Sequence, residues 1–433
     1  MLFYSLNKIS PSVNFREAAI SGQAPDKGLY FPESIPVLPP DFFKQLKSKT
    51  KEQIAFEVIK PYIGNSIPED VLHTICTETV NFDFPLKKIN STIYSLELFH
   101  GPTLAFKDVG ARFMSRCLGY FSRDSDKEVT VLVATSGDTG SAVANGFLGV
   151  KGVNVVILYP SGKVSKIQEL QLTTLGKNIT ALEVQGTFDD CQSMVKQAFS
   201  DQQLNARLTL TSANSINVAR WLPQQFYYFY ALQQWTEQHP PVISVPSGNF
   251  GNICAGLLAY FSGAPIKHFV AACNTNDIFS NYIANKAFTP KTAVATISNA
   301  MDVGNPSNFV RMLEMFENKH NQVKELISNS CVDDELTAKT ILDVYEKYNY
   351  LLEPHGAVAY EGLQQYLVQH PEQKGILLET AHPIKFDDTV KKITGQHSIE
   401  MPDSVKYLLE LQKKSSVIKP EFNELKNFLL ANK

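Results

Sequence analysis

The stretch "VTVLVATSGDTGSAVANGF", Val129–Phe147, decides the fold class of this chain. Its first six residues form an unbroken β-rich run, which suits a strand buried on both faces, and a glycine-rich turn then leads into a helical pattern. Similar runs recur along the chain with helical patterns between them. They are "VNVVILY" from Val153, "PVISV" from Pro241, "HFVAAC" from His268 and "GILLE" from Gly375. This alternation predicts a doubly wound parallel α/β sheet.

A second glycine-rich turn, "SVPSGNFGN" from Ser244 to Asn252, also joins a predicted strand to a predicted helix. Its consecutive backbone N–H groups can form a concave nest with the positive end of the helix behind it, which suits one phosphate. The turn is neither a GxxxxGK[ST] loop nor the GxGxxG of dinucleotide binding. Taken alone, it is equally consistent with a tight strand-to-helix connection.

Two polar segments could bind further anions. The turn "ATSGDTGSA", Ala134–Ala142, offers the hydroxyls of Thr135, Ser136 and Thr139 at a helix N-terminus, which suits a carboxylate. The segment "TSANSINVAR" brings Asn214, Ser215 and Arg220 within reach of one another if it turns into a helix. An arginine with amides and a hydroxyl fits a second phosphate, and the alternative is a helix cap followed by a surface arginine.

Lys107 is the one lysine in the otherwise apolar stretch "FHGPTLAFKDVGARF", Phe99–Phe113. A buried ammonium is costly unless it is paired, so a lysine that reaches out to water is the ordinary explanation. An imine formed with an aldehyde removes that cost and leaves the lysine able to act as a base. A phosphate nest on the same sheet indicates which aldehyde, namely pyridoxal 5′-phosphate.

Together these segments resemble the threonine synthase family of pyridoxal-phosphate enzymes, in the fold type II (tryptophan-synthase-β) group. The resemblance runs in order along nearly the whole chain. It rests on "GLYFPESIP", "HGPTLAFKDVGARFM", "ATSGDTGSAVA", "VVILYPSGKVS", "SANSINVAR", "VPSGNFGN", "NAMDVGNPSN", "EPHGAVAY" and "TAHPIKF". It implies doubly wound sheets in two domains around a pyridoxal-phosphate cleft, with an N-terminal domain in front.

The resemblance also assigns roles to individual residues. Lys107 is implied as the catalytic lysine that carries the cofactor, and Thr380 as the hydroxyl facing its pyridine nitrogen. Asp138 matches the position beside the phenolic oxygen, where an aspartate would have to share a proton. The implied cofactor-phosphate loop is Gly248, Asn249, Phe250, Gly251 and Asn252, with Asn252 replacing an aspartate of close relatives. The implied substrate-binding residues are Ser136 and Thr139 for the carboxylate and Asn214, Ser215 and Arg220 for the phosphate. No metal is implied.

The reaction implied is the conversion of O-phospho-L-homoserine and water to L-threonine and phosphate, the last step of threonine biosynthesis. We expect an N-terminal domain over residues 1–95, a pyridoxal-phosphate-binding core over 96–390 and a C-terminal helical segment over 391–433. Exclusion of water from the unsaturated intermediate would require a smaller mobile subdomain at about residues 127–220. A helix start at His355 would pack near the cofactor, and His355 and His382 are expected only to make cap or turn hydrogen bonds.

Composition narrows the possible partners. The chain has 433 residues, 44% of them hydrophobic, and a formal net charge of −3, so no broad positive field exists for nucleic acid. No signal peptide or membrane-spanning run is evident, which predicts a cytoplasmic protein. The sequence leaves the oligomeric state open between a monomer and a homodimer. The helical segment "RMLEMFENKHNQVKEL", from Arg311, is typical of a solvated surface.

Other functions remain open from the sequence alone. A serine/threonine dehydratase or a cysteine synthase would share the fold but needs no site for a substrate phosphate, so "SANSINVAR" separates these possibilities. A related protein that binds pyridoxal phosphate or a phosphorylated ligand without the full reaction is a further alternative. If the cofactor assignment fails, the chain would be a sugar-phosphate-binding α/β protein.

Overall fold

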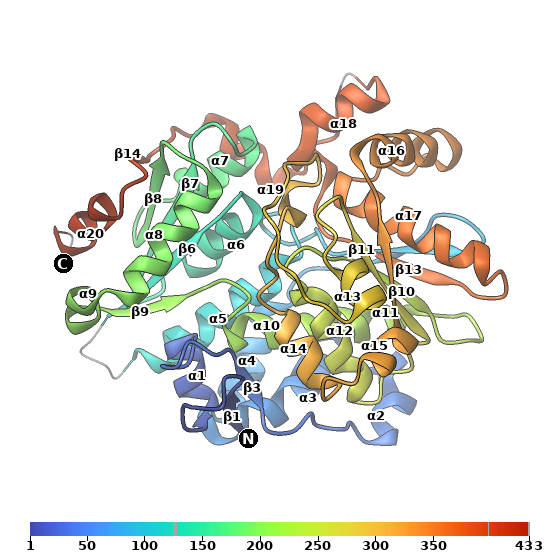
Figure 1. Cartoon of the computed structure of the whole chain (residues 1–433), viewed down its shortest axis with the longest axis horizontal. Helices are drawn as coiled ribbons and strands as arrows, with labels where there is room; N and C mark the ends of the chain where they lie inside the picture. The colour runs from blue at the N-terminus through green and yellow to red at the C-terminus, as the bar shows by residue number, and fades with distance from the viewer. Residues whose placement is uncertain (124–127, 397, 432–433) are drawn as a thin grey trace.

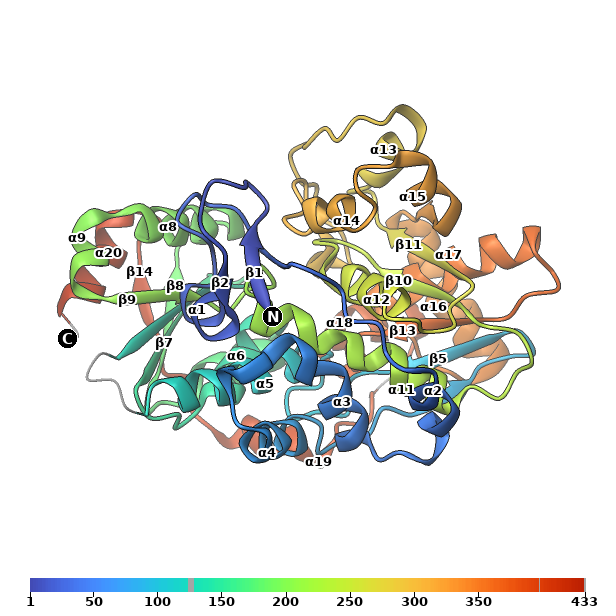
Figure 2. The same ribbon diagram turned by 90° about the horizontal axis from the view of Figure 1, so that it is seen from below.

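The structure is a computed structural model that describes residues 1–123, 128–396 and 398–431. In Figure 1 the N-terminal elements lie at the bottom, a five-stranded sheet lies to the left and a six-stranded sheet to the right. Figure 2 shows the same arrangement from below, with the N-terminal elements alongside both sheets.

The N-terminal part combines a small antiparallel sheet, of order β2-β1-β3, with four helices. Asn14 with Glu17, and Thr50 with Gln53, form capping boxes that start two of the helices. The elements are β1 (Leu2–Ser5), β2 (Val13–Asn14), α1 (Phe15–Ser21), β3 (Tyr30–Pro32), α2 (Pro40–Gln45), α3 (Lys51–Ile63) and α4 (Glu69–Thr79).

The larger sheet has the order β12-β11-β10-β13-β5-β4, and all its neighbouring strands are parallel except β4 and β5. Its strands are β4 (Leu86–Lys88), β5 (Ile93–Glu97), β10 (Val242–Pro246), β11 (His268–Cys273), β12 (Ile327–Cys331) and β13 (Gly375–Glu379). The helices of this part are α5 (Lys107–Phe121), α11 (Phe226–Gln234), α12 (Gly251–Phe261), α13 (Phe279–Asn285), α14 (Phe309–Met315), α15 (His320–Leu326), α16 (Asp334–Tyr348), α17 (Pro354–Gln369) and α18 (Asp387–Thr394).

The smaller sheet is parallel throughout, with the order β14-β8-β7-β6-β9. Its strands are β6 (Val129–Ala134), β7 (Val153–Pro160), β8 (Ile179–Val184), β9 (Thr209–Ser212) and β14 (Ser416–Ile418). The remaining helices are α6 (Asp138–Phe147), α7 (Lys166–Thr173), α8 (Phe188–Ser200), α9 (Gln202–Arg207), α10 (Val218–Trp221), α19 (Asp403–Lys406) and α20 (Phe422–Ala431).

The predicted fold class is confirmed. All five apolar runs read as strands from the sequence are strands here, namely β6, β7, β10, β11 and β13. Their residues are almost entirely buried, as expected for strands covered by helices on both faces.

The predicted domain boundaries remain predictions, and Lys127, where the smaller subdomain was expected to begin, lies outside the described residues. Beyond residue 391 the chain returns to the smaller sheet, because β14 pairs with β8 at its edge. There Ile418, Leu425 and Leu429 join the apolar cluster that includes Val184 and Met194. The C-terminal segment therefore contributes a strand as well as helices.

In the described ranges, none of the helices has the length and apolarity needed to cross a bilayer. The same residues contain no grouping of three or more His, Cys, Asp or Glu side chains that could hold a metal ion.

Strand order determines where a ligand can bind. Each sheet has one pair of neighbouring strands at which the connections to the other strands change direction along the sheet. This pair is β10 and β13 in the larger sheet and β6 and β9 in the smaller. Crevices at such switch points, outside the carboxyl ends of the strands, are the usual ligand sites of open α/β sheets. The polar segments singled out in the sequence follow these four strands.

Candidate active site

Lys107 is the first residue of α5, and the residues before it form backbone hydrogen bonds with the segment after β13. The N–H of Phe106 donates to the carbonyl of Thr380 at 2.8 Å, and Ala105 forms an isolated bridge with Ala381. The Tyr227 hydroxyl donates to the carbonyl of Phe106. These contacts place the lysine and Thr380 at the same end of the larger sheet.

The Nζ atom of Lys107 forms no hydrogen bond or ion pair within the part of the chain that the structure describes, and it lies over the Phe106 ring, 5.6 Å from the centroid. Burial lowers the pKa of Lys107, the carboxylate of Asp138 opposes this, and the charges of Lys385 and Arg220 add to it. A lysine with a lowered pKa holds more of the unprotonated amine that attacks an aldehyde.

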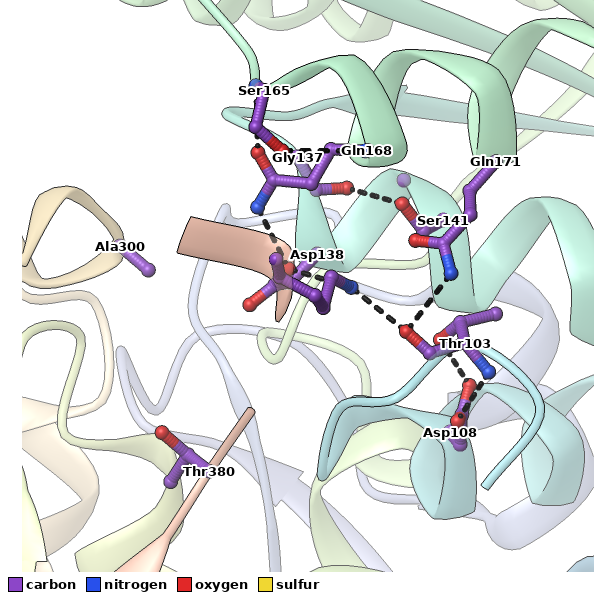
Figure 3. Close-up of polar contacts among 12 residues, drawn as sticks. Thr103, Asp108, Gly137, Asp138, Ser141, Ser165, Gln168, Gln171, Ala300 and Thr380 are labelled. Carbon is purple, nitrogen blue, oxygen red and sulfur yellow. Dashed lines mark hydrogen bonds and ion pairs between the residues drawn. The ribbon is translucent and has the colours of Figure 1, made fainter. Parts of the chain in front are cut away.

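Asp138 forms a buried ion pair across the two sheets. Its Oδ1 atom lies 2.8 Å from Nζ of Lys385 and accepts a hydrogen bond from Nε2 of Gln168 at 2.9 Å (Figure 3). Burial acts to raise the pKa of Asp138, but the ammonium groups of Lys385 and Lys107 outweigh it and hold the pKa below the usual aspartate range. The carboxylate is therefore ionised. Lys385 also donates to the carbonyl of Thr103 at 2.8 Å.

Thr380 follows β13 and donates its hydroxyl hydrogen to Oε1 of Glu353 at 3.2 Å. The same carboxylate accepts from the backbone N–H groups of His355 and Gly356 and from Nδ1 of His355 at 2.6 Å. Because the Thr380 hydroxyl hydrogen is donated to Glu353, Thr380 retains only its lone pairs for another partner.

The two histidines act as expected. Nε2 of His355 accepts from the N–H of Ala300 at 3.1 Å, and Nδ1 of His382 accepts from the N–H of Ile384 at 3.2 Å. Burial lowers the pKa of His382 to about 4. Each ring thus accepts a hydrogen bond from a backbone N–H group, and Nδ1 of His355 also bonds the Glu353 carboxylate.

The turn after β10 has the geometry of an anion nest. Phe250 caps α12 with a left-handed backbone, φ 59°, and such turns direct successive N–H groups toward one point. A Cβ on Gly248 would lie 2.6 Å from the Cα of Met301, so the turn has no room for a side chain there. Nδ2 of Asn252 is buried without a hydrogen-bond partner among the described residues.

Ser215, from the second predicted phosphate cluster, lies directly against this nest. Its Oγ atom accepts from Nδ2 of Asn249 at 2.9 Å and from Nδ2 of Asn308 at 3.0 Å. A Cβ on Gly251 would lie 3.2 Å from the Cβ of Ser215. The loops after β9 and β10, which belong to different sheets, thus form one continuous polar surface.

Arg220 is nearly fully buried on α10, and its Nη1 donates to the carbonyl of Lys107 at 3.0 Å. Its Nε has no partner in the described ranges, and burial lowers its pKa to about 10. The structure thus links Arg220 to Lys107 directly, whereas no recorded hydrogen bond joins it to Asn214 or Ser215. Ser136 and Thr139 are half-buried at the start of α6, beside Asp138.

Comparisons with known proteins agree with this geometry. The family described as "Pyridoxal-phosphate dependent enzyme" matches residues 72–378, and the families of the threonine synthase N terminus and C-terminal region match residues 2–80 and 356–429. Threonine synthase of Buchnera aphidicola from Schizaphis graminum is 43% identical over 433 residues, which cover 99% of this chain and 100% of the relative. The chain belongs to the threonine synthase family.

Solved structures of threonine synthases lead to the same family. The crystal structure of the Escherichia coli enzyme superimposes with a TM-score of 0.93 at 40% identity and covers 100% of both chains. That of the pyridoxal-phosphate-bound enzyme from Brucella melitensis gives 0.91 at 32% identity, over 99% of this chain and 98% of that one. The predicted fold group and the predicted cofactor class are thereby confirmed.

The residues present fit pyridoxal 5′-phosphate. Lys107 has an unpaired amine for the aldehyde. The nest after β10 has an unpartnered donor, Nδ2 of Asn252, and no space for a side chain at Gly248. The ionised Asp138 and the lone pairs of Thr380 are available to polar atoms of the ring. The site thus offers a group for each polar function of the cofactor.

Three important charged residues did not emerge from the sequence. The expectation that the segment from Arg311 is solvated was wrong at Arg311 itself, which is fully buried behind Ser215. Lys385 and Glu353 lie within "TAHPIKF" and "EPHGAVAY", yet both are fully buried and bound to other parts of the site. One signal in the sequence could have found two of them. Glu353 and Lys385 each have a proline within two residues, and a proline marks a turn beside the charge.

Proposed function

We propose that this protein converts O-phospho-L-homoserine and water to L-threonine and phosphate, using pyridoxal 5′-phosphate held at Lys107. The observation that supports this most strongly is the hydrogen bond of 2.9 Å between Asn249 and Ser215. It joins a phosphate nest to a second polar cluster, so two phosphate groups could be bound side by side. A dehydratase or a cysteine synthase needs only the first.

In this proposal the nest of Gly248, Asn249, Phe250, Gly251 and Asn252 binds the cofactor phosphate, Thr380 faces the pyridine nitrogen and Asp138 lies beside the phenolic oxygen. The turn with Ser136 and Thr139 binds the substrate carboxylate, and Asn214, Ser215 and Arg220 bind the substrate phosphate. Bound in this way, the cofactor withdraws electrons from the substrate and makes the hydrogens on Cα and Cβ acidic.

The chain's own residues move the protons. With the cofactor bound, the free amine of Lys107, whose pKa burial lowers, would take a proton from Cα and then one from Cβ, so that phosphate could leave from Cγ. Arg220 and Ser215 would stabilise the departing phosphate. Water would then add its hydroxyl group at Cβ, and protons would return to Cα and Cγ to give threonine. The ion pair of Asp138 with Lys385 maintains opposite charges beside Lys107 throughout.

The smaller sheet would close over the larger one to exclude water, because the predicted substrate-binding residues follow strands of the smaller sheet and the predicted cofactor-phosphate loop follows a strand of the larger sheet. A cytoplasmic location and a monomeric or homodimeric state complete the proposal.

A substrate panel tests it. The purified protein, loaded with cofactor, should release threonine from O-phospho-L-homoserine and should show far lower activity with L-threonine or O-acetyl-L-serine. Release of 2-oxobutanoate from L-threonine as the main activity would favour a dehydratase instead.

A further inference from the structure

Arg311, on α14, is a fully buried cation with no carboxylate partner in the described part of the chain. Its Nη1 donates to the carbonyl of Ser215 at 2.7 Å and to Oδ1 of Asn308 at 2.8 Å, and its Nη2 donates to the carbonyls of Ile216 at 2.7 Å and Tyr30 at 3.2 Å. The guanidinium also lies over the Trp221 ring, 4.1 Å from its centroid. Buried charges are ordinarily paired, so an unpaired one beside a polar surface indicates an anionic ligand.

Arg311 fixes the orientation of the neighbouring amide. A guanidinium only donates hydrogen bonds, so the atom of Asn308 that faces it must be the oxygen. Nδ2 of Asn308 is then directed the other way, where it donates to Oγ of Ser215 and to the carbonyl of Asn249, both at 3.0 Å. Asn308 is itself fully buried.

A second amide is fixed in the same way. The backbone N–H of Ser307 donates to Oδ1 of Asn249 at 2.6 Å, which leaves Nδ2 of Asn249 to donate to Oγ of Ser215 at 2.9 Å. The two lone pairs of the Ser215 hydroxyl are therefore both occupied by N–H donors. Its hydrogen has no acceptor in the described ranges, so this hydroxyl can act only as a donor to a ligand.

We propose that Arg311 and Asn308 are positioning residues that commit the Ser215 hydroxyl to donate a hydrogen bond to a phosphate monoester bound beside the start of α12. The inference rests on the proposed function, which supplies two such groups, one on the cofactor and one on the substrate. The hydroxyl, the unpaired charge behind it and the N-terminus of α12 all favour a dianion over a neutral group.

Asn308→Asp tests the proposal with little change of shape. A carboxylate only accepts hydrogen bonds, so the substituted side chain would take the hydrogen of Ser215, and its charge would pair with Arg311. Isothermal titration of the cofactor-loaded protein with inorganic phosphate should show affinity at least about tenfold weaker than wild type, as expected when a hydrogen bond to a charged group is lost. Asn318→Asp makes the same change at an exposed position just beyond α14 and should bind phosphate normally.

A double-mutant cycle separates positioning from simple support of the fold. In a Ser215→Ala background, Asn308→Asp should weaken phosphate binding by less than about threefold, because the hydroxyl it acts through is gone. Arg311→Lys keeps a donor for Asn308 and should restore most of the affinity lost in Arg311→Met. Equal losses from Asn308→Asp in both backgrounds would overturn the proposal. Normal affinity of Asn308→Asp for both inorganic phosphate and pyridoxal 5′-phosphate would also overturn it.

The two sources of phosphate are distinguished by a second readout. If Ser215 binds the substrate phosphate, Asn308→Asp should raise the KM for O-phospho-L-homoserine and the Ki of inorganic phosphate together, with little change in kcat. If it binds the cofactor phosphate, the variant should lose affinity for pyridoxal 5′-phosphate but not for pyridoxal. Either result supports the proposal. If the wild type binds inorganic phosphate but does not turn over O-phospho-L-homoserine, the proposed function is refuted and the proposal about Ser215 is not.

Discussion

Nζ of Lys385 lies 2.8 Å from Oδ1 of Asp138, and both side chains are almost completely removed from solvent. The pair joins the turn that starts α6, in the smaller sheet, to the segment after β13 in the larger one. Removal of one partner would leave an uncompensated charge in the interior, which is far more costly than loss of an exposed pair. Both charges also act on the pKa of Lys107, which Asp138 raises and Lys385 lowers.

Asp138→Asn should shift the pH dependence of cofactor attachment to lower pH. Only the unprotonated amine of Lys107 attacks an aldehyde, so attachment to the apoprotein rises as pH rises through the pKa of Lys107. Burial lowers that pKa and the Asp138 carboxylate opposes the lowering, so removing the carboxylate lowers it further. Borohydride trapping at a series of pH values measures the midpoint. The double variant with Lys385→Met should move the midpoint back up, and an unchanged midpoint in Asp138→Asn would contradict the electrostatic account.

Lys107→Ala should fold normally but lose covalent attachment of the cofactor and reduce turnover by at least about a hundredfold, because the residue is both anchor and base. Peptide mass spectrometry of the wild-type protein after borohydride reduction identifies the lysine that carries the cofactor. Cofactor mass on a lysine other than Lys107 would show that the assignment is wrong.

Gly248→Ala should weaken cofactor binding more than Gly251→Ala does. The new Cβ would lie 2.6 Å from a backbone atom of Met301 in the first case and 3.2 Å from the side chain of Ser215 in the second. Overpacking of this kind costs about 1–3 kcal/mol, which corresponds to roughly five- to 150-fold in the Kd for pyridoxal 5′-phosphate. Equal affinities of both variants and wild type in a cofactor titration would place the phosphate elsewhere.

Arg220→Ala should keep the cofactor spectrum while lowering kcat/KM for O-phospho-L-homoserine by at least about tenfold, since a charge-assisted hydrogen bond is worth about 1.5–3 kcal/mol. The variant also loses the hydrogen bond to the carbonyl of Lys107, a neutral acceptor, which matters less. Arg220→Lys should recover only part of the loss, because lysine lacks the planar fork that grips two oxygens. Normal kinetics in Arg220→Ala would return the dehydratase alternative to consideration.

Much of the architecture could be predicted because the central strands are continuous apolar runs. β6, β7, β10, β11 and β13 carry that signal, and the glycine-rich turns after β6 and β10 mark the ends where ligands bind. The strand β5 escaped notice because "IYSLE" mixes polar and apolar residues, although all five are buried. Its Ser95 accepts a hydrogen bond from Tyr350, a partner that only the folded chain reveals.

The sequence could predict candidate site residues where one short segment carries the signal, as at Lys107 and "SGNFGN", and their roles stay predictions. The sequence could not predict a charge that is buried against distant parts of the chain. Arg311 sits in a segment of surface composition, and a fully buried arginine is rare enough that exposure was the better expectation. Its role depends on carbonyls of Ser215, Ile216 and Tyr30, which no local pattern brings together.

The most direct test of the central claim is product analysis with O-phospho-L-homoserine in ¹⁸O-labelled water. Because water adds at Cβ and phosphate leaves from Cγ with its ester oxygen, the account predicts equal amounts of threonine and phosphate, with the label in the threonine hydroxyl and none in the phosphate. Homoserine with labelled phosphate would show hydrolysis at phosphorus, and 2-oxobutanoate would show a dehydratase. Either product in place of labelled threonine would contradict the proposed function.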